Sequence, residues 1–196
     1  GVAAQPVSVV DKGILKTFLL SRSPIKTVRV SNGHGRRQPG LEVVARQSNL
    51  LVNSARRLPN AELRKALIDE VKKQNKPYGL FFKEVTGGYT TTRRQGLQAF
   101  TVIPLVVYRV FPDGRPDEMV RGVDIVGTPL SSFSKILATG EREEVFNGYC
   151  GAESGDVPVS AVSPALLVSE IEVQRKPAPS DRPPLLPKPM ISQEMP

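Results

Sequence analysis

The stretch LQAFTVIPLVVYRVFPDGRPDEMVRGVDI, residues 97–125, indicates the fold class of this chain. Its first part, residues 97–111, is a long apolar run of the kind that forms strands. Pro104 stands inside this run and predicts an edge position or a bulge, because proline cannot donate to a strand ladder. Pro112-Asp113-Gly114 is typical of a hairpin turn, after which apolar residues return as far as Ile125. The stretch therefore predicts two antiparallel strands.

Further short apolar runs on either side of this stretch predict more strands. They lie at residues 13–30, 41–52, 78–85, 157–162 and 166–173. Gly87-Gly88 follows one of these runs, and we expect it to be a loop where the backbone can approach another chain closely.

Two helices are expected among these strands. The longer one begins at Asn60, a good N-cap residue, and ends near Asn75 and Pro77. Its apolar residues recur at every fourth position and form one face. The shorter helix opens at Thr128-Pro129, carries Leu130 and is closed by Gly140. Together these elements predict an α+β fold that is β-rich, with mostly antiparallel twisted sheets, one long helix and one short helix.

The two ends of the chain differ in composition. Seven of the 18 prolines fall within residues 176–196, so we expect a domain at 1–175 and a proline-rich tail at 176–196 in extended or polyproline form. The chain starts at Gly1 without methionine, and we expect it to be an excised part of a longer protein. No apolar run is long enough to span a membrane, and a single cysteine excludes an internal disulfide.

The chain is basic, with 27 Lys and Arg against 19 Asp and Glu and a formal net charge of +8. This excess favours acidic or phosphate partners and makes nucleic acid an alternative partner to consider. Few aromatic residues stand among the basic ones, however, and neither a recognition helix nor a zinc finger is apparent. Nucleic-acid binding is therefore the less favoured interpretation.

Few residues in the chain could carry chemistry. Cys150 is the only cysteine, and it is either a small buried hydrophobic residue or a thiolate that needs partners to bind a metal or to attack a substrate. The only histidine, His34, lies in a glycine-rich basic loop and is interpreted as exposed or packed within that loop. Arg36 and Arg37 follow it, and they either clamp a carboxylate or peptide terminus or are ordinary surface charge.

Five segments, in this order and with these gaps, resemble the carboxy-terminal half of the TldD/PmbA family, once called modulators of DNA gyrase. They are Gly13–Lys16, Asn32–Arg37, Gly122–Thr128, Asn147–Val159 and Ser163–Val168. The resemblance extends over residues 12 to 174. It implies a zinc-dependent peptidase that acts on unstructured peptides, works in the cytoplasm and pairs TldD-type with PmbA-type subunits.

In that family an amino-terminal half supplies a His-Glu-x-x-x-His motif, and a cysteine of the carboxy-terminal half completes the protein ligands of zinc. Three protein ligands and an open position are typical of catalytic zinc. Cys150 matches the family's cysteine, whereas the histidines and the glutamate have no counterpart here. The resemblance therefore implies that this chain holds no catalytic residue of its own and contributes one zinc ligand to a site completed elsewhere.

The family's cleft takes extended peptides, and we expect strand addition near Gly87 and Gly88, with Arg36 and Arg37 as further substrate-binding candidates. PmbA-type subunits lack the metal histidines and can keep the cysteine. A catalytically silent subunit that binds peptide or supports an active partner therefore stays an alternative.

Overall fold

The structure is a computed structural model, and it describes residues 1–23, 25–91, 96 and 98–176. The chain divides into two compact units. Unit 1 consists of Gly1–Leu67 and Ile136–Val168, and unit 2 consists of Ile68–Lys135 and the chain from Ser169 onward. The predicted tail at 176–196 falls, apart from Lys176, outside the described residues.

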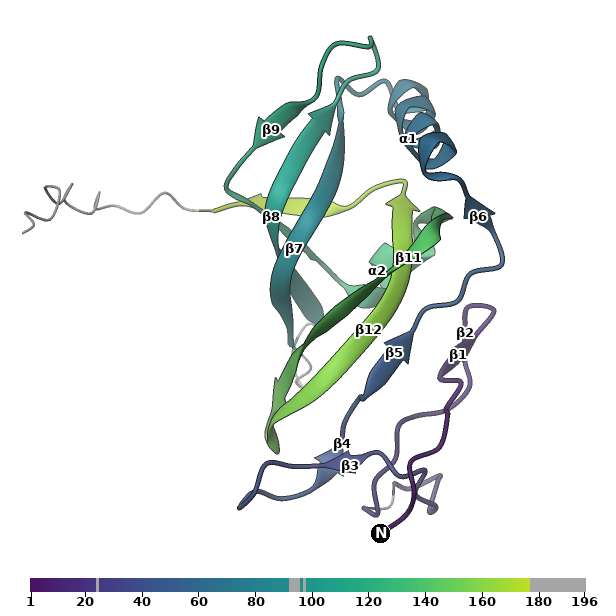
Figure 1. Cartoon of the computed structure of the whole chain (residues 1–196), viewed down its shortest axis with the longest axis vertical. Helices are drawn as coiled ribbons and strands as arrows, with labels where there is room; N and C mark the ends of the chain where they lie inside the picture. The colour runs from purple at the N-terminus through teal and green to yellow at the C-terminus, as the bar shows by residue number, and fades with distance from the viewer. Residues whose placement is uncertain (24, 92–95, 97, 177–196) are drawn as a thin grey trace, which may run out of the picture. The chain divides into compact units, whose positions relative to one another are not determined.

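Unit 1 is built on a long β-hairpin. Strand β11 (Ile136–Ala152) runs antiparallel to β12 (Gly155–Val168), and the two are drawn as paired ribbons in Figure 1. β5 (Asn49–Leu51) pairs with β12 and β6 (Arg57–Leu58) pairs with β11, both in parallel, which gives the sheet order β5-β12-β11-β6. The buried apolar side chains of unit 1 belong to Leu20, Ala138, Val157 and Leu167.

Two small hairpins complete the strands of unit 1. β1 (Val10–Asp11) pairs with β2 (Ile14–Leu15), and β3 (Gly35–Arg36) pairs with β4 (Val44–Ala45). These strands are shorter than the runs at 13–30 and 41–52 suggested. The sheets are mostly antiparallel, as the sequence predicted.

Unit 2 contains the hairpin region predicted at 97–125. β7 (Gly79–Thr91) pairs with β8 (Ala99–Val110), and β8 pairs in turn with β9 (Glu118–Val120) and β10 (Val123–Gly127). β13 (Glu172–Arg175) pairs with β10, so the strands of this sheet follow the order β13-β10-β8-β7. The buried apolar side chains of unit 2 belong to Val107 and Val110 on β8, to Ile125 on β10, and to Val71 and Phe111 outside the strands.

Pro104 is accommodated by an irregularity in the sheet. β8 pairs with β10 at 100–102 and with β9 at 107–109, so Pro104 falls between these two partners on that side. On the other side the register of β7 and β8 shifts near Val85 and its partner Pro104. Proline therefore sits where the ladder is already interrupted, and of the two predicted placements the bulge is the one found.

The long helix α1 (Asn60–Lys73) confirms the predicted helix and its stop signal. Asn75 has a φ of 52° and its N–H donates to Lys72 O at 3.0 Å, while the N–H of Lys76 donates to Val71 O at 3.0 Å. These two bonds form a Schellman cap, in which asparagine tolerates the left-handed conformation. No helix among the described residues is long and apolar enough to cross a membrane.

In the last turn of α1, Glu70 forms hydrogen bonds with two neighbouring side chains. Its carboxylate accepts hydrogen bonds from Gln74 Nε2 at 2.8 Å and from Lys73 Nζ at 3.1 Å. The bond from Gln74, followed by that from Lys73, lowers the pKa of Glu70. The ionised carboxylate thus stabilises the end of α1 above the ordinary glutamate pKa, and this contribution is lost as the pH falls through the lowered value.

The short helix α2 (Pro129–Ser134) begins as predicted, with Thr128 at the N-cap and Pro129 in the first turn. It does not end at Gly140, and that prediction was wrong. Gly140 is buried inside β11, where an added Cβ would lie 3.3 Å from Asn60 Oδ1 and 3.4 Å from Ala165 Cβ. This glycine serves close packing in a sheet instead of stopping a helix.

Two other predicted boundaries were also wrong. Gly87-Gly88 is not a loop, because β7 continues through both residues. The runs at 157–162 and 166–173 are not two separate strands, because β12 is continuous to Val168 and the break follows at 169–171. In both cases cross-strand pairing extends the strand through residues whose local preference indicated a break.

Candidate metal-ligand hairpin

Cys150 lies near the end of the β11–β12 hairpin in unit 1. It pairs with Val157 across the two strands, and its free thiol is half-buried. Successive residues of a strand point to opposite faces, so Cys150 shares its face with Gly148 and with the buried Val157. A paired strand of this kind holds the position of the thiol more closely than a loop does.

An aromatic side chain lies on the same face of β11. A Cβ added at Gly148 would come within 2.8 Å of the Phe146 ring, so the ring covers Gly148. Phe146 is nevertheless 46% exposed. The Cys150 face of the hairpin therefore carries an accessible aromatic surface beside it.

The hairpin end is held by Arg46, whose side chain is only 4% exposed. Its Nη1 donates to Ser154 Oγ and to Gly155 O, each at 2.7 Å, and its Nη2 donates to Cys150 O. Sequence reasoning missed Arg46. No local signal marked it, because its partners lie more than 100 positions later in the sequence.

His34 is buried within the loop that supports Arg46. Its Nδ1 lies 3.1 Å from Asn32 O and 3.0 Å from Asn32 Oδ1, both acceptors, so Nδ1 carries the proton. Asn32 Oδ1 also accepts from the N–H of Leu20 at 2.7 Å. Of the two interpretations of this histidine, loop packing is therefore the one that the structure supports.

Arg36 and Arg37 lie in and just after β3. Arg36 Nη1 donates to Gly33 O and Gly35 O, both at 2.8 Å, and Arg37 Nη1 donates to Leu41 O at 2.9 Å. These bonds tie both guanidinium groups to their own hairpin. Each guanidinium has five N–H donors, so further donors are left for a substrate carboxylate. Their substrate-binding role stays a prediction.

Gly87 and Gly88 lie in unit 2, on β7. Among the described residues β7 pairs with β8 alone, so its other edge is open. Gly88 is closely packed, because an added Cβ would lie 2.3 Å from Thr101 O, whereas nothing lies within 4 Å of a Cβ added at Gly87. The structure therefore brings together Cys150 and Arg46, and places the two glycines in the other unit.

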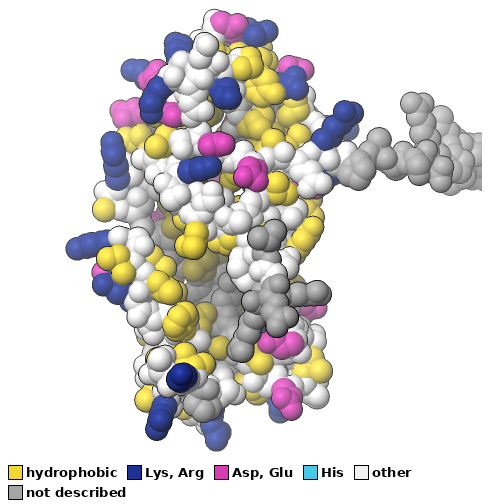
Figure 2. Space-filling view, turned by 180° about the vertical axis from the view of Figure 1, so that it is seen from behind, with side chains coloured by type: hydrophobic (Ala, Val, Ile, Leu, Met, Phe, Trp, Pro, Cys, Tyr) yellow, Lys and Arg dark blue, Asp and Glu magenta, His cyan; other side chains and the backbone are white. Residues whose placement is uncertain are grey.

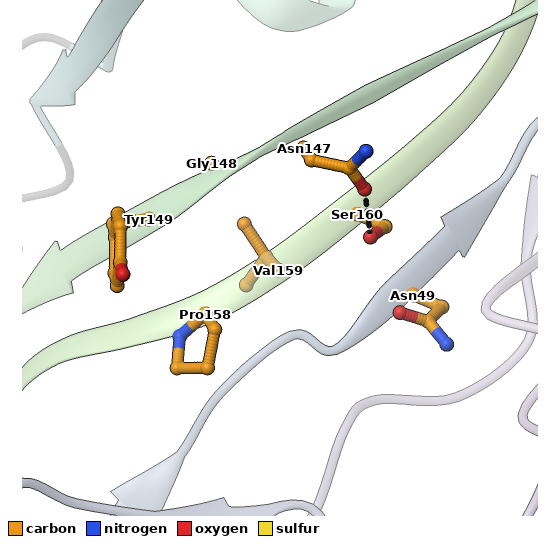
Figure 3. Close-up of a pocket in the computed structure, with 7 residues that line it drawn as sticks. All are labelled: Asn49, Asn147, Gly148, Tyr149, Pro158, Val159 and Ser160. Atoms are coloured by element: carbon orange, nitrogen blue, oxygen red, sulfur yellow. Dashed lines mark hydrogen bonds between the residues drawn. The ribbon is translucent and has the colours of Figure 1, made fainter.

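A shallow groove crosses β5, β11 and β12 (Figure 3), with a volume of about 410 Å³. Ser160 Oγ donates to Asn147 Oδ1 at 2.6 Å, and the two side chains point toward one another in the figure. Asn147 is an odd number of residues from Cys150, so the two side chains lie on opposite faces of β11. Cys150 itself does not line the groove.

The structure describes one candidate thiolate ligand for a metal, Cys150. No group of three or more His, Cys, Asp and Glu side chains that could hold a metal occurs among the residues that the structure describes. Cys150 fits a zinc site as one soft thiolate ligand on a firmly held strand. The remaining ligands would have to come from outside the described part of the chain.

Comparison with known proteins decides the family. The model of the family described as "PmbA/TldA metallopeptidase C-terminal domain" matches this chain over residues 1–175. The chain belongs to this family. The resemblance found in the sequence is thereby confirmed.

A curated relative points the same way. Metalloprotease MJ0996 from Methanocaldococcus jannaschii is 26% identical to this member of the family over 160 residues, which are 81% of the chain but 32% of that protein. The chain thus spans about a third of the relative's length.

Proposed function

We propose that this PmbA/TldA domain is the ligand-donating part of a zinc-dependent peptidase that acts on unstructured peptides. Cys150 would hold the metal together with side chains from the rest of a longer protein. The observation that carries this proposal is the half-buried free thiol near the end of a braced hairpin, in a chain of a metallopeptidase family. Zinc, when bound, would polarise the scissile carbonyl as a Lewis acid.

This chain's own contribution to such a site is placement. β11 and β12 set the backbone at Cys150, and Phe146 offers an apolar surface on the same face of the strand. That surface would exclude water on one side of the site and contact an apolar side chain of the substrate. Arg36 and Arg37 would bind carboxylate groups of the peptide through the donors that their own loop leaves free.

A zinc measurement tests this proposal. We expect the full-length protein that carries this domain to contain about one zinc per chain, and its Cys150→Ser variant to lose most of that metal, because a hydroxyl is a far poorer zinc ligand than a thiolate. Elemental analysis after gel filtration measures the content. Metal absent from both proteins would instead support a silent subunit that binds peptide, and Cys150 would be a packing residue.

We also propose that the open edge of β7 receives the substrate by strand addition. An unpaired strand offers a row of backbone N–H and C=O groups to an extended peptide. A photo-crosslinking peptide should therefore label residues of β7 around Gly87 in the full-length protein. Labels that fall only on other elements would remove β7 from the substrate path.

The surface charge supports a peptide rather than a nucleic acid as the partner. Figure 2 shows both Lys and Arg side chains and Asp and Glu side chains on the face that it draws. A nucleic-acid footprint needs clustered cations along a groove or helix. The excess of basic residues would then act as a general attraction for acidic segments of a substrate.

A further inference from the structure

The end of the β11–β12 hairpin is fixed by one buried guanidinium. Arg46 donates to three acceptors, namely Cys150 O, Ser154 Oγ and Gly155 O, on both sides of the hairpin turn. Ser154 is completely buried. Because the planar guanidinium offers its donors in a rigid fork, these bonds fix the direction of the two strands where they meet.

Arg46 is itself held in place by the loop beside it. Its backbone N–H donates to His34 O at 2.9 Å, and the N–H of His34 donates to Leu20 O at 3.1 Å. The N–H of Gln38 donates to Ser154 O at 2.9 Å and gives the turn a second attachment. The hairpin end is therefore held by a segment that lies more than 100 residues earlier in the sequence.

The interactions of Arg46 are directional rather than purely electrostatic. Within the described part of the chain, no carboxylate forms an ion pair with it. A buried charge of this kind is tolerated because its donors are hydrogen-bonded. A lysine ammonium in the same place has neither the reach nor the fork to bind carbonyls on both strands at once.

We propose that Arg46 is a positioning residue, which sets the backbone of Cys150 so that its thiolate points at the metal. This inference rests on the proposed function of Cys150. Arg46 touches Cys150 only through the carbonyl oxygen and so would act through that residue, without contacting metal or substrate. Loss of such a supporting contact typically weakens metal binding by roughly 10- to 100-fold.

The test uses the full-length protein and its Arg46→Lys variant. Zinc affinity is measured by competition with a chelator, and cobalt(II) in place of zinc reports thiolate ligation through its near-ultraviolet charge-transfer absorption. In the metal-free protein, the alkylation rate of Cys150 is followed by mass spectrometry of its peptide. We expect roughly 10- to 100-fold weaker zinc binding, a weaker cobalt–thiolate band and about tenfold faster alkylation.

Arg57→Lys is the matched control. Arg57 also contacts β11, through an ion pair with Glu143 at 2.7 Å, but it lies far along the strand from Cys150. This variant should keep wild-type affinity, absorption and alkylation. If Arg46→Lys does not fold, Ser154→Ala, which removes one acceptor and leaves Arg46 in place, should show the same changes at a few-fold size.

The outcomes separate this inference from the proposed function. If Cys150→Ser loses zinc while Arg46→Lys keeps wild-type affinity and the cobalt band, Cys150 is a ligand and the positioning role of Arg46 is refuted. If zinc binding does not depend on Cys150 at all, the proposed function fails, and with it the metal-directed role of Arg46. An unchanged alkylation rate in Arg46→Lys would show that Arg46 does not hold the hairpin end.

Discussion

The isolated chain of residues 1–196 should neither retain zinc nor cleave peptides. One thiolate is a weak zinc site, because catalytic zinc needs three protein ligands to hold it against water and buffer. His34 and Cys150 belong to no group of three or more ligand side chains among the described residues.

Equilibrium dialysis against zinc at a low concentration, followed by elemental analysis, measures this directly. Retained zinc should be far below one equivalent and should change little in the Cys150→Ser variant. A peptidase assay on an unfolded protein should give the rate of the buffer alone. One equivalent of firmly held zinc, or robust cleavage, would show that this chain carries a complete site and would refute the ligand-donating role.

Local signals in the sequence were sufficient for much of the fold. The cap at the end of α1 depends on Asn75 and its neighbours alone, and the start of α2 depends on Thr128 and Pro129. The turn after β8 likewise depends on Pro112-Asp113-Gly114, where Gly114 adopts a φ of 85°. Such features are decided within a few residues, so they can be read without knowing the tertiary structure.

Glycines were interpreted less successfully, because their role depends on which strand lies opposite. Gly140 and Gly88 looked like a helix stop and a loop, yet both lie inside strands that other groups approach closely. The neighbours of Gly140, Asn60 and Ala165, are distant in sequence. No local pattern distinguishes a glycine needed for close packing from one that breaks a strand.

The candidate site shows the same limit. Cys150 was singled out because it is the only cysteine and because its surroundings resemble a family segment. Arg46, which binds the carbonyl oxygen of Cys150, is 104 positions away, and nothing in its own surroundings announces that contact. Pairwise contacts over such distances arise from tertiary packing, so Cys150 was predicted as a candidate ligand and its contact with Arg46 was not predicted.

Gly88→Ala should destabilise unit 2 far more than Gly87→Ala. At Gly88 the new methyl group would lie 2.3 Å from Thr101 O and 3.1 Å from Val102 Cα, which are backbone atoms of β8. Backbone in a paired strand cannot turn aside as a side chain can, so we expect a loss of about 2 kcal/mol. At Gly87 nothing lies within 4 Å, and alanine should be neutral or stabilise the strand by about 0.5 kcal/mol.

Urea unfolding followed by circular dichroism, with hydrogen exchange of the β8 amides as a local measurement, compares the two variants. Equal stabilities would mean that β8 is not packed against Gly88. The comparison also separates the two roles proposed for this glycine pair. Gly88 packs against the backbone of β8, whereas the space at Gly87 is open. A peptide added to the open edge of β7 would therefore contact the strand at Gly87. Gly87→Val should then impair peptide crosslinking to β7 while leaving the stability of unit 2 near that of the wild type.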